Sequence, residues 1–264
     1  MRLPLAGTPF GATPSFVELL QRERPEAIPA GLTTPGTPLS VPHGTTVLGL
    51  KYAEGVVMAG DRRATAGNQI ADPKMRKVFP ADAYSAIAIA GAAGQAIELV
   101  KLFQLELEHY EKITGDRLSL EGKANRLAQM IRGNFPMAMQ GLIVVPLFGG
   151  YDQRRGEGRI FYYDATGGRG EEDDYQTTGS GALPAKNSLK KRWRHDLSAD
   201  EALRVAVEAL IDAAEDDAAT GGPDTARGIW PIVMTVTTTG SDDVAEDRIA
   251  AAVDEVLAAR GAAS

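Results

Sequence analysis

Residues 43–61, HGTTVLGLKYAEGVVMAGD, decide the fold, because ordered structure is predicted to begin abruptly inside this stretch. The β-branched and apolar runs 45–50 and 55–61 predict two strands, and the turn residues 52–55 between them predict a hairpin. The sequence Gly44-Thr45-Thr46 stands at the start of the first strand. Gly44, Thr45 and Thr46 therefore lie at the border between a proline-rich N-terminal segment and the first predicted strand.

The segment before this border, residues 1–44, has its own composition. It holds eight of the fifteen prolines of the chain, and only residues 15–24 show helical periodicity. The rest of the segment is predicted to be extended and flexible. Composition alone favours a flexible tail over a removable prosegment, so the second interpretation needs support from the chemistry at Thr45.

The remaining elements come in groups. Strands are predicted at 75–79 and 84–91, followed by helices at 92–112 and 119–139, and Pro136 is expected to end or kink the second helix near Phe135. Strands follow at 142–148, 159–164 and 175–179, with a loop at 167–174. The chain then continues with helices at 181–191 and 196–219, a strand at 228–239 and a helix at 244–260. Groups of strands between pairs of helices predict an α+β fold, a four-layer αββα sandwich of two antiparallel sheets flanked by helices. A doubly wound parallel fold would alternate strand and helix singly.

Composition disfavours several classes of function. The formal net charge of −7 argues against a nucleic-acid partner, which needs a basic face. No stretch approaches the roughly 20 apolar residues of a membrane helix. The N-terminus, MRLPLAGTPFGATP, is interrupted by prolines and glycines and does not predict a secretory signal. We therefore expect a cytoplasmic protein with no membrane partner.

The chain also lacks the residues of several common active sites. It has no cysteine, which removes disulfides, thiolate zinc sites and a cysteine nucleophile. Its three histidines, His43, His109 and His195, stand in no ligand cluster and beside no GxSxG elbow. The Gly-rich segment 179–186 lacks the Gly-Lys-Ser/Thr ending of a phosphate loop. We therefore expect no metal, no cofactor and no histidine-dependent serine catalysis.

Thr45 offers a different chemistry. A hydroxyl is a weak nucleophile without a base, but a threonine at a chain terminus carries its own base, because an α-amine has a pKa of about 7.7–8.0. Cleavage between Gly44 and Thr45 creates that arrangement, and glycine lets the backbone bend closely at the scissile bond. Alone this signal is weak, since threonine is a common strand residue.

Further motifs support this interpretation by their order and spacing. They are the Gly44-Thr45-Thr46 start, GDRRAT at 60–65, Lys77 at 32 residues after Thr45, Ala90-Gly91 before a long helix, GSG at 179–181 and DAATG at 217–221. With these motifs the chain resembles, from residue 45 to about 240, the proteasome β-subunit family of N-terminal-nucleophile hydrolases. The prosegment and the composition resemble the actinobacterial members most.

The resemblance implies a threonine endopeptidase that degrades unfolded or tagged proteins inside a closed chamber. It also implies a precursor that cleaves itself between Gly44 and Thr45. The products are then a propeptide, residues 1–44, and a mature catalytic domain, residues 45–264.

The resemblance also implies the roles of the site residues. Thr45 Oγ is the nucleophile, Lys77 is a cation that lowers the pKa of the Thr45 amine, and Asp61 is the partner of Lys77. The backbone N–H of Gly91 is the oxyanion donor. The polar network around the Thr45 amine consists of Ser180, Asp217 and Thr220. The last of these stands where the family often has serine, and it keeps the hydroxyl.

Substrate recognition is implied in the same way. The backbones of Thr65 and Ala93 hold the substrate as an added strand. The side chains that shape the specificity pocket are Ala64, Met75, Ile89, Ala93 and Ile97. Because this lining is apolar and uncharged, we expect chymotrypsin-like cleavage.

The resemblance implies partners as well: proteasome α subunits, two heptameric β rings between two α rings, and an AAA ATPase ring that feeds substrates, some tagged by prokaryotic ubiquitin-like protein. Three alternatives stay open. A simpler two-ring bacterial peptidase is disfavoured by the long prosegment and the closing helix. A small-molecule amidase would need an assay with both substrate types. A silent ring subunit is disfavoured because Thr45 and Lys77 are both present.

Overall fold

The computed structural model describes residues 44–263, which belong to one compact unit. Two five-stranded sheets with antiparallel pairing form its centre. The first, in the order β10-β1-β2-β11-β12, contains β1 (Thr46–Tyr52), β2 (Gly55–Gly60), β10 (Tyr175–Gly179), β11 (Ile232–Thr237) and β12 (Gly240–Asp243). The second, in the order β5-β6-β7-β8-β9, contains β5 (Val78–Asp82), β6 (Ser85–Gly91), β7 (Val144–Asp152), β8 (Glu157–Tyr163) and β9 (Arg169–Glu172).

Strand β6 shows why the two sheets can pack face to face. Its sequence, SAIAIAG, alternates alanine with isoleucine. The alanines join a buried cluster with residues of both sheets, whereas Ile87 and Ile89 join a second cluster with helical residues. Because neighbouring residues of a strand point to opposite faces, the small side chains lie between the sheets and the large ones lie under the helices.

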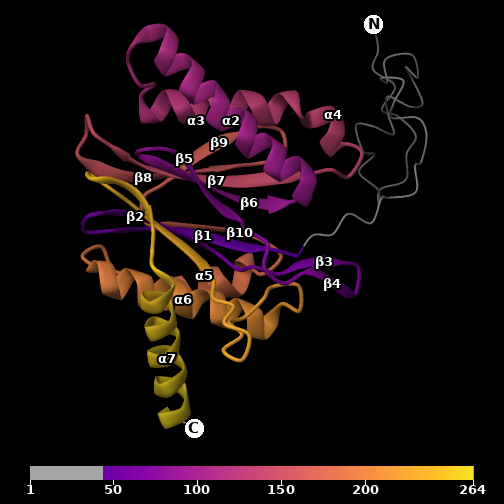
Figure 1. Cartoon of the computed structure of the whole chain (residues 1–264), viewed down its shortest axis with the longest axis vertical. Helices are drawn as coiled ribbons and strands as arrows, with labels where there is room; N and C mark the ends of the chain where they lie inside the picture. The colour runs from indigo at the N-terminus through magenta and orange to yellow at the C-terminus, as the bar shows by residue number, and fades with distance from the viewer. Residues whose placement is uncertain (1–43, 264) are drawn as a thin grey trace, which may run out of the picture. The chain divides into compact units, whose positions relative to one another are not determined.

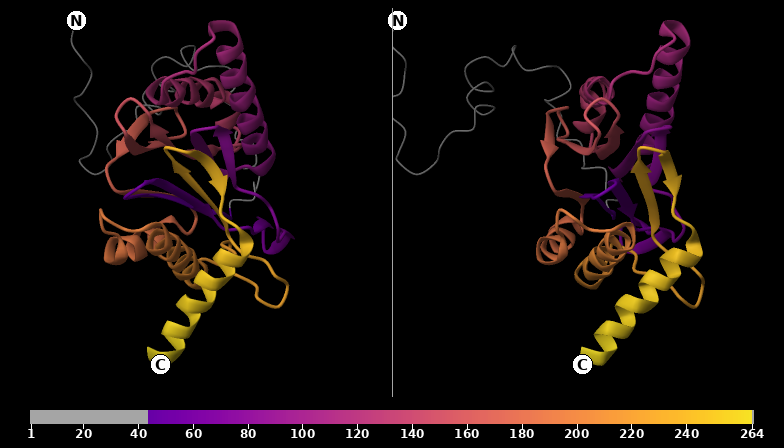
Figure 2. Two further views of the ribbon diagram at one scale, coloured as in Figure 1. Left: turned by 60° about the vertical axis from the view of Figure 1, so that its left-hand side comes forward. Right: turned by 90° about the vertical axis from the view of Figure 1, so that its left-hand side faces the viewer.

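Helices cover the outer face of each sheet (Figure 1). They are α2 (Ala93–Thr114), α3 (Leu120–Gly133), α4 (Phe135–Ala138), α5 (Ala182–Arg192), α6 (Ala199–Asp216) and α7 (Glu246–Ala263). Residues of α2 and α3 pack on the second sheet, and residues of α5, α6 and α7 pack on the first. The C-terminal part of α7 extends beyond the other elements (Figure 2). The predicted four-layer αββα sandwich is confirmed.

The predicted loop at 167–174 is wrong, because its central residues form β9 at the edge of the second sheet. Glu171 of this strand accepts two hydrogen bonds of 2.6 Å from the guanidinium of Arg159, whose side chain is only 2% exposed. A buried cation needs carboxylate partners. The segment is therefore ordered by a contact with β8 that local sequence does not show.

Other boundaries also differ from the predictions. Residues 64–72, which predicted no element, form a hairpin of β3 (Ala64–Ala66) and β4 (Gln69–Asp72). The helix predicted at 119–139 ends at Gly133, and Pro136 lies at the start of the short α4. The predicted break of the helix near Phe135 is therefore present. The predicted helix 15–24 and the predicted propeptide up to residue 43 lie outside the described residues.

Candidate active site

Thr45 lies directly before β1, beside the end of β10. The N–H of Ser180 donates to the Thr45 carbonyl oxygen at 2.8 Å, and the Thr45 N–H donates to Ser180 Oγ at 3.3 Å. The Thr45 hydroxyl donates to the carbonyl oxygen of Gly44 at 2.5 Å. In the uncleaved chain, the hydroxyl is therefore held against the peptide group that precedes its own residue.

A buried ion pair lies next to this peptide group. Lys77, directly before β5, pairs with Asp61, directly after β2, at 2.7 Å, and the two side chains are 1% and 0% exposed. Lys77 Nζ also donates to the carbonyl oxygens of Arg63 at 2.6 Å and of Gly44 at 3.2 Å. All three N–H bonds of an ammonium thus have acceptors. The lysine joins the second sheet to the first at the predicted scissile bond.

The Asp61 carboxylate is fixed from both sides. Its Oδ1 accepts from the backbone N–H of Thr46 at 2.8 Å, and its Oδ2 accepts from the N–H groups of Arg63 at 2.8 Å and Gly221 at 2.9 Å. Burial lowers the pKa of Lys77 below its ordinary value, while the charge of Asp61 opposes this fall. The site therefore holds a compact ammonium group that gives up its proton more readily than an exposed lysine does.

Ser180, Asp217 and Thr220 meet on the other side of Thr45. Asp217 Oδ2 accepts from Ser180 Oγ at 2.5 Å and from Thr220 Oγ1 at 2.6 Å. Burial raises the pKa of Asp217, but these two hydroxyl donors and the N–H of Ala219 outweigh burial and leave that pKa below its ordinary value. An ionised carboxylate is thus linked, through Ser180, to the nitrogen of Thr45.

A cavity of about 110 Å³ opens beside Thr45. Its lining includes most of the residues predicted for substrate binding, namely Ala64, Thr65, Met75, Ile89 and Ala93. The structure does not place Ile97 in the lining, and Ile97 packs instead on the cluster under the helices. Ala96 lines the cavity in its place. Both residues lie one helical turn after Ala93, so only packing decides between them.

Gly91 ends β6 and lines the same cavity as Thr45. Its φ of 112° lies in a region that side chains rarely adopt, and a methyl group there would meet the carbonyl oxygen of Ile143. Glycine is therefore required at this position by the backbone. The role of its N–H as an oxyanion donor stays a prediction.

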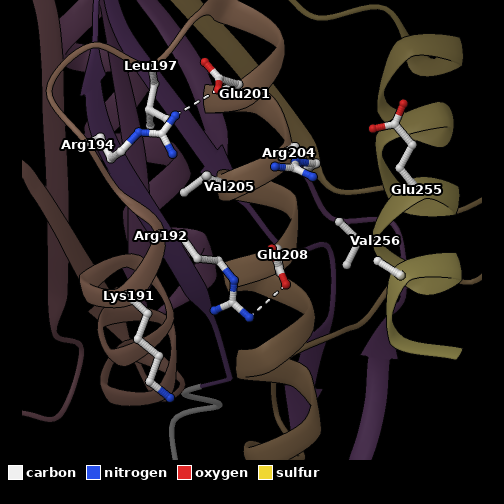
Figure 3. A pocket seen from close by; sticks show the side chains of 11 residues that line it. Lys191, Arg192, Arg194, Leu197, Glu201, Arg204, Val205, Glu208, Glu255 and Val256 are labelled. Carbon is white, nitrogen blue, oxygen red and sulfur yellow. Dashed lines mark hydrogen bonds and ion pairs between the residues drawn. The ribbon is translucent and has the colours of Figure 1, made fainter. Parts of the chain in front are cut away.

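A larger hollow, of about 350 Å³, lies between α5, α6 and α7 (Figure 3). Two of its arginines are paired with carboxylates of its own walls, Arg192 with Glu208 at 2.8 Å and Arg194 with Glu201 at 2.9 Å. No hydroxyl side chain is among its lining residues. It offers no nucleophile, so we place the candidate site at the smaller cavity of Thr45.

No group of three or more His, Asp or Glu side chains between residues 44 and 263 could hold a metal ion. Within the same range, no helix combines the length and the apolar composition needed to cross a membrane.

Comparison with known proteins is consistent with this geometry. A family model described as proteasome subunit matches residues 41–226. The proteasome subunit beta of Streptomyces griseus subsp. griseus is 58% identical over 241 residues, which cover 90% of this chain and 85% of the relative. The region matched by the family model includes every residue placed around Thr45 above, from Gly44 to Gly221.

Proposed function

Since the chain belongs to the proteasome subunit family, we infer that it is a threonine endopeptidase, the catalytic β subunit of a 20S core particle. We propose Thr45 as its nucleophile. The observation that supports this assignment is the meeting of three groups at one peptide bond: the Thr45 hydroxyl, the buried Lys77–Asp61 ion pair, and the hydroxyl network on Asp217. An apolar cavity lies beside them.

Self-cleavage comes first, because the Thr45 nitrogen of the uncleaved chain is an amide and cannot act as a base. Thr45 Oγ attacks the carbonyl carbon of Gly44, the bond from that carbon to the Thr45 nitrogen breaks, and the hydroxyl proton ends on the nitrogen. Water then opens the resulting ester, which leaves a carboxylate on Gly44 and restores the hydroxyl. Residues 1–44 are the proposed propeptide, and residues 45–264 are the proposed mature domain.

The contacts at Gly44 support this step. Its carbonyl oxygen accepts from the Thr45 hydroxyl at 2.5 Å and from Lys77 Nζ at 3.2 Å. A cation on that oxygen stabilises the negative charge that develops during attack. In the uncleaved chain, Lys77 is therefore a candidate oxyanion donor beside the predicted N–H of Gly91.

In the processed chain, we propose that the free Thr45 amine takes the hydroxyl proton as Oγ attacks a substrate carbonyl. Ser180 and Asp217 hold this amine, and the Lys77 cation favours its neutral, basic form. Two substrate-binding residues lie at β3 and at the start of α2, namely Thr65 and Ala93. In the described sheets β3 pairs only with β4, so its other edge can accept a substrate strand. The apolar cavity favours cleavage after apolar side chains.

A member of this family assembles with other proteasome subunits. For this chain we propose α subunits as partners, heptameric β rings between α rings, and an AAA ATPase ring that delivers unfolded or tagged proteins. Tagging by prokaryotic ubiquitin-like protein and a cytoplasmic location stay predictions from the resemblance.

We expect self-cleavage to depend on assembly. If neighbouring subunits order the groups around Gly44 for attack, the isolated chain should keep its full-length mass and mixing with its α partner should remove residues 1–44. Intact mass spectrometry before and after mixing measures this. A Thr45→Ala chain should stay at full length in the same mixture. Loss of residues 1–44 from that control would demonstrate cleavage in trans, and full activity from an unprocessed chain would refute the mechanism.

We expect Gly44→Ala to block or strongly slow self-cleavage. A methyl group at this position would lie 2.6 Å from Thr65 Oγ1 and 2.8 Å from the carbonyl oxygen of Ala219, so the scissile peptide has to move. The measurement is the rate at which the full-length mass disappears after assembly. Gly133→Ala is the matched control, because a methyl group there meets nothing within 4 Å. Processing of the Gly44→Ala chain at the wild-type rate would contradict the prediction.

A further inference from the structure

Thr46, the residue after the proposed nucleophile, is tied to the site through both its backbone and its side chain. It is completely buried. Its N–H donates to Asp61 Oδ1 at 2.8 Å, and its carbonyl oxygen accepts from the Asp61 N–H at 3.0 Å. Its Oγ1 lies 2.6 Å from Thr220 Oγ1, which is also completely buried. The sequence places Thr46 in the Gly44-Thr45-Thr46 motif and gives its hydroxyl no role.

The direction of the bond between the two threonines follows from their protons. A hydroxyl has one proton to donate. Thr220 donates its proton to Asp217 Oδ2 at 2.6 Å, because an ionised carboxylate can only accept. The bond from Thr46 must therefore run toward Thr220. The side chains form a directed series from Thr46 to Thr220 to Asp217.

This series closes a ring that includes the Thr45 nitrogen. Asp217 Oδ2 also accepts from Ser180 Oγ at 2.5 Å, and Ser180 Oγ accepts from the Thr45 N–H at 3.3 Å. The peptide bond between Thr45 and Thr46 completes the ring. Asp217 Oδ2 therefore accepts from two hydroxyls, that of Ser180, which contacts the Thr45 nitrogen, and that of Thr220, which contacts Thr46.

The contact between the two threonine hydroxyls requires a residue without a side chain at position 181. A methyl group on Gly181 would meet Thr46 Oγ1 and would lie 2.8 Å from Thr220 Oγ1. The glycine of the GSG segment therefore lets the two hydroxyls come together. Its place is explained by this contact, which the motif alone did not show.

We propose that Thr46 is a positioning residue for the Thr45 amine, acting through Thr220 and Asp217. Its hydroxyl orients the Thr220 hydroxyl toward the carboxylate, and the carboxylate in turn holds Ser180 against the nitrogen that serves as base. This inference rests on the proposed function, because it assumes that Thr45 becomes a terminal amine.

The charged groups around the Thr45 nitrogen determine how loss of the Thr46 hydroxyl changes the pKa of the Thr45 amine. Asp217 lies on the side of the nitrogen, the Lys77–Asp61 pair lies on the side of Oγ, and Arg63 donates from Nη1 to the Ala218 carbonyl oxygen at 3.0 Å. Hydrogen bonds to a carboxylate spread its charge, and a series of such bonds is mutually strengthening. Without the first donor, more of the Asp217 charge is available to the ammonium form of Thr45, and the pKa of that amine rises.

The test is the pH dependence of kcat/KM for the Thr46→Val variant, assembled as the full chain with α subunits and checked for processing by intact mass. Valine keeps the shape and removes the hydroxyl. We expect kcat to fall by about tenfold, the scale of one buried hydrogen bond, and the acid limb of the profile to move to higher pH. Thr46→Ser should return both to wild-type behaviour.

A Thr220→Val variant and the double variant separate positioning from packing. If Thr46 acts through Thr220, the double variant should lose no more kcat than Thr220→Val alone. Additive losses with an unmoved acid limb would overturn the inference. If Thr46→Val slows self-cleavage, its rate is compared with that of Thr46→Ser, and equally slow rates would also overturn the inference. An inactive wild-type particle would instead refute the proposed function.

Discussion

Replacement of Thr45 by alanine is expected to abolish peptide hydrolysis and leave the fold intact. The side chain supplies the attacking oxygen, and among residues 44–263 its hydroxyl makes one hydrogen bond, to the carbonyl oxygen of Gly44. Removal of a hydrolase nucleophile costs on the order of 10⁶-fold in kcat, which places residual turnover below detection. Hydrolysis of an apolar fluorogenic peptide by the assembled particle measures the loss, and a thermal melt checks the fold.

Three controls make the Thr45 result specific. Thr235→Ala removes a threonine from β11, in the sheet whose strand β1 follows Thr45, and should leave turnover unchanged. An irreversible threonine-directed inhibitor should add mass only to the peptide that begins at Thr45. Thr45→Ser should keep measurable activity, because serine supplies the oxygen without the methyl group that restricts χ1. Turnover like that of the wild type in Thr45→Ala would refute the assignment.

Replacement of Lys77 by alanine is expected to lower kcat by at least about 10³-fold, in line with the large and non-additive losses when members of a catalytic unit are removed. The change removes the cation that contacts the Gly44 carbonyl oxygen and leaves Asp61 buried without its partner. Breaking a buried pair costs about 3–5 kcal/mol of stability. Single-turnover hydrolysis and a thermal melt should therefore be measured on the same preparation.

Two further variants separate lost stability from lost chemistry. Combining Lys77→Met with Asp61→Asn removes both charges, so the melting temperature should recover in part while activity does not. Recovery is only partial because asparagine keeps one of the two oxygens that accept backbone N–H bonds. Lys123→Met removes another buried lysine, which pairs with Asp82 at 2.5 Å, and should lower stability without lowering kcat. Lys77→Arg should also fail, since a planar guanidinium does not fit the three acceptors around Nζ. An active Lys77→Ala variant would refute the proposed site.

The sequence by itself determined the fold class and the order of the long strands and helices, but not the short strands β3, β4, β9 and β12. Strand patterns such as SAIAIAG and long apolar helical faces depend on neighbours a few residues away, so their period is visible without a structure. The motifs from Thr45 to Thr220 were found through their resemblance to a known family, because local periodicity does not connect residues so far apart. The structure brings the residues predicted around the nucleophile together, apart from Ile97 in the pocket.

Tertiary structure alone decided the features that depend on contacts across the chain. β9 is ordered by the buried Arg159 of the neighbouring strand, a partner that its own residues do not reveal. Ala96 and Ile97 both lie one helical turn after Ala93, so the sequence does not show which of them lines the cavity. Packing places Ala96 there. Thr46 has the ordinary pattern of a strand residue, yet its hydroxyl reaches Thr220, 174 positions away. Such pairs are set by how the sheets and loops pack, and local periodicity carries no information about them.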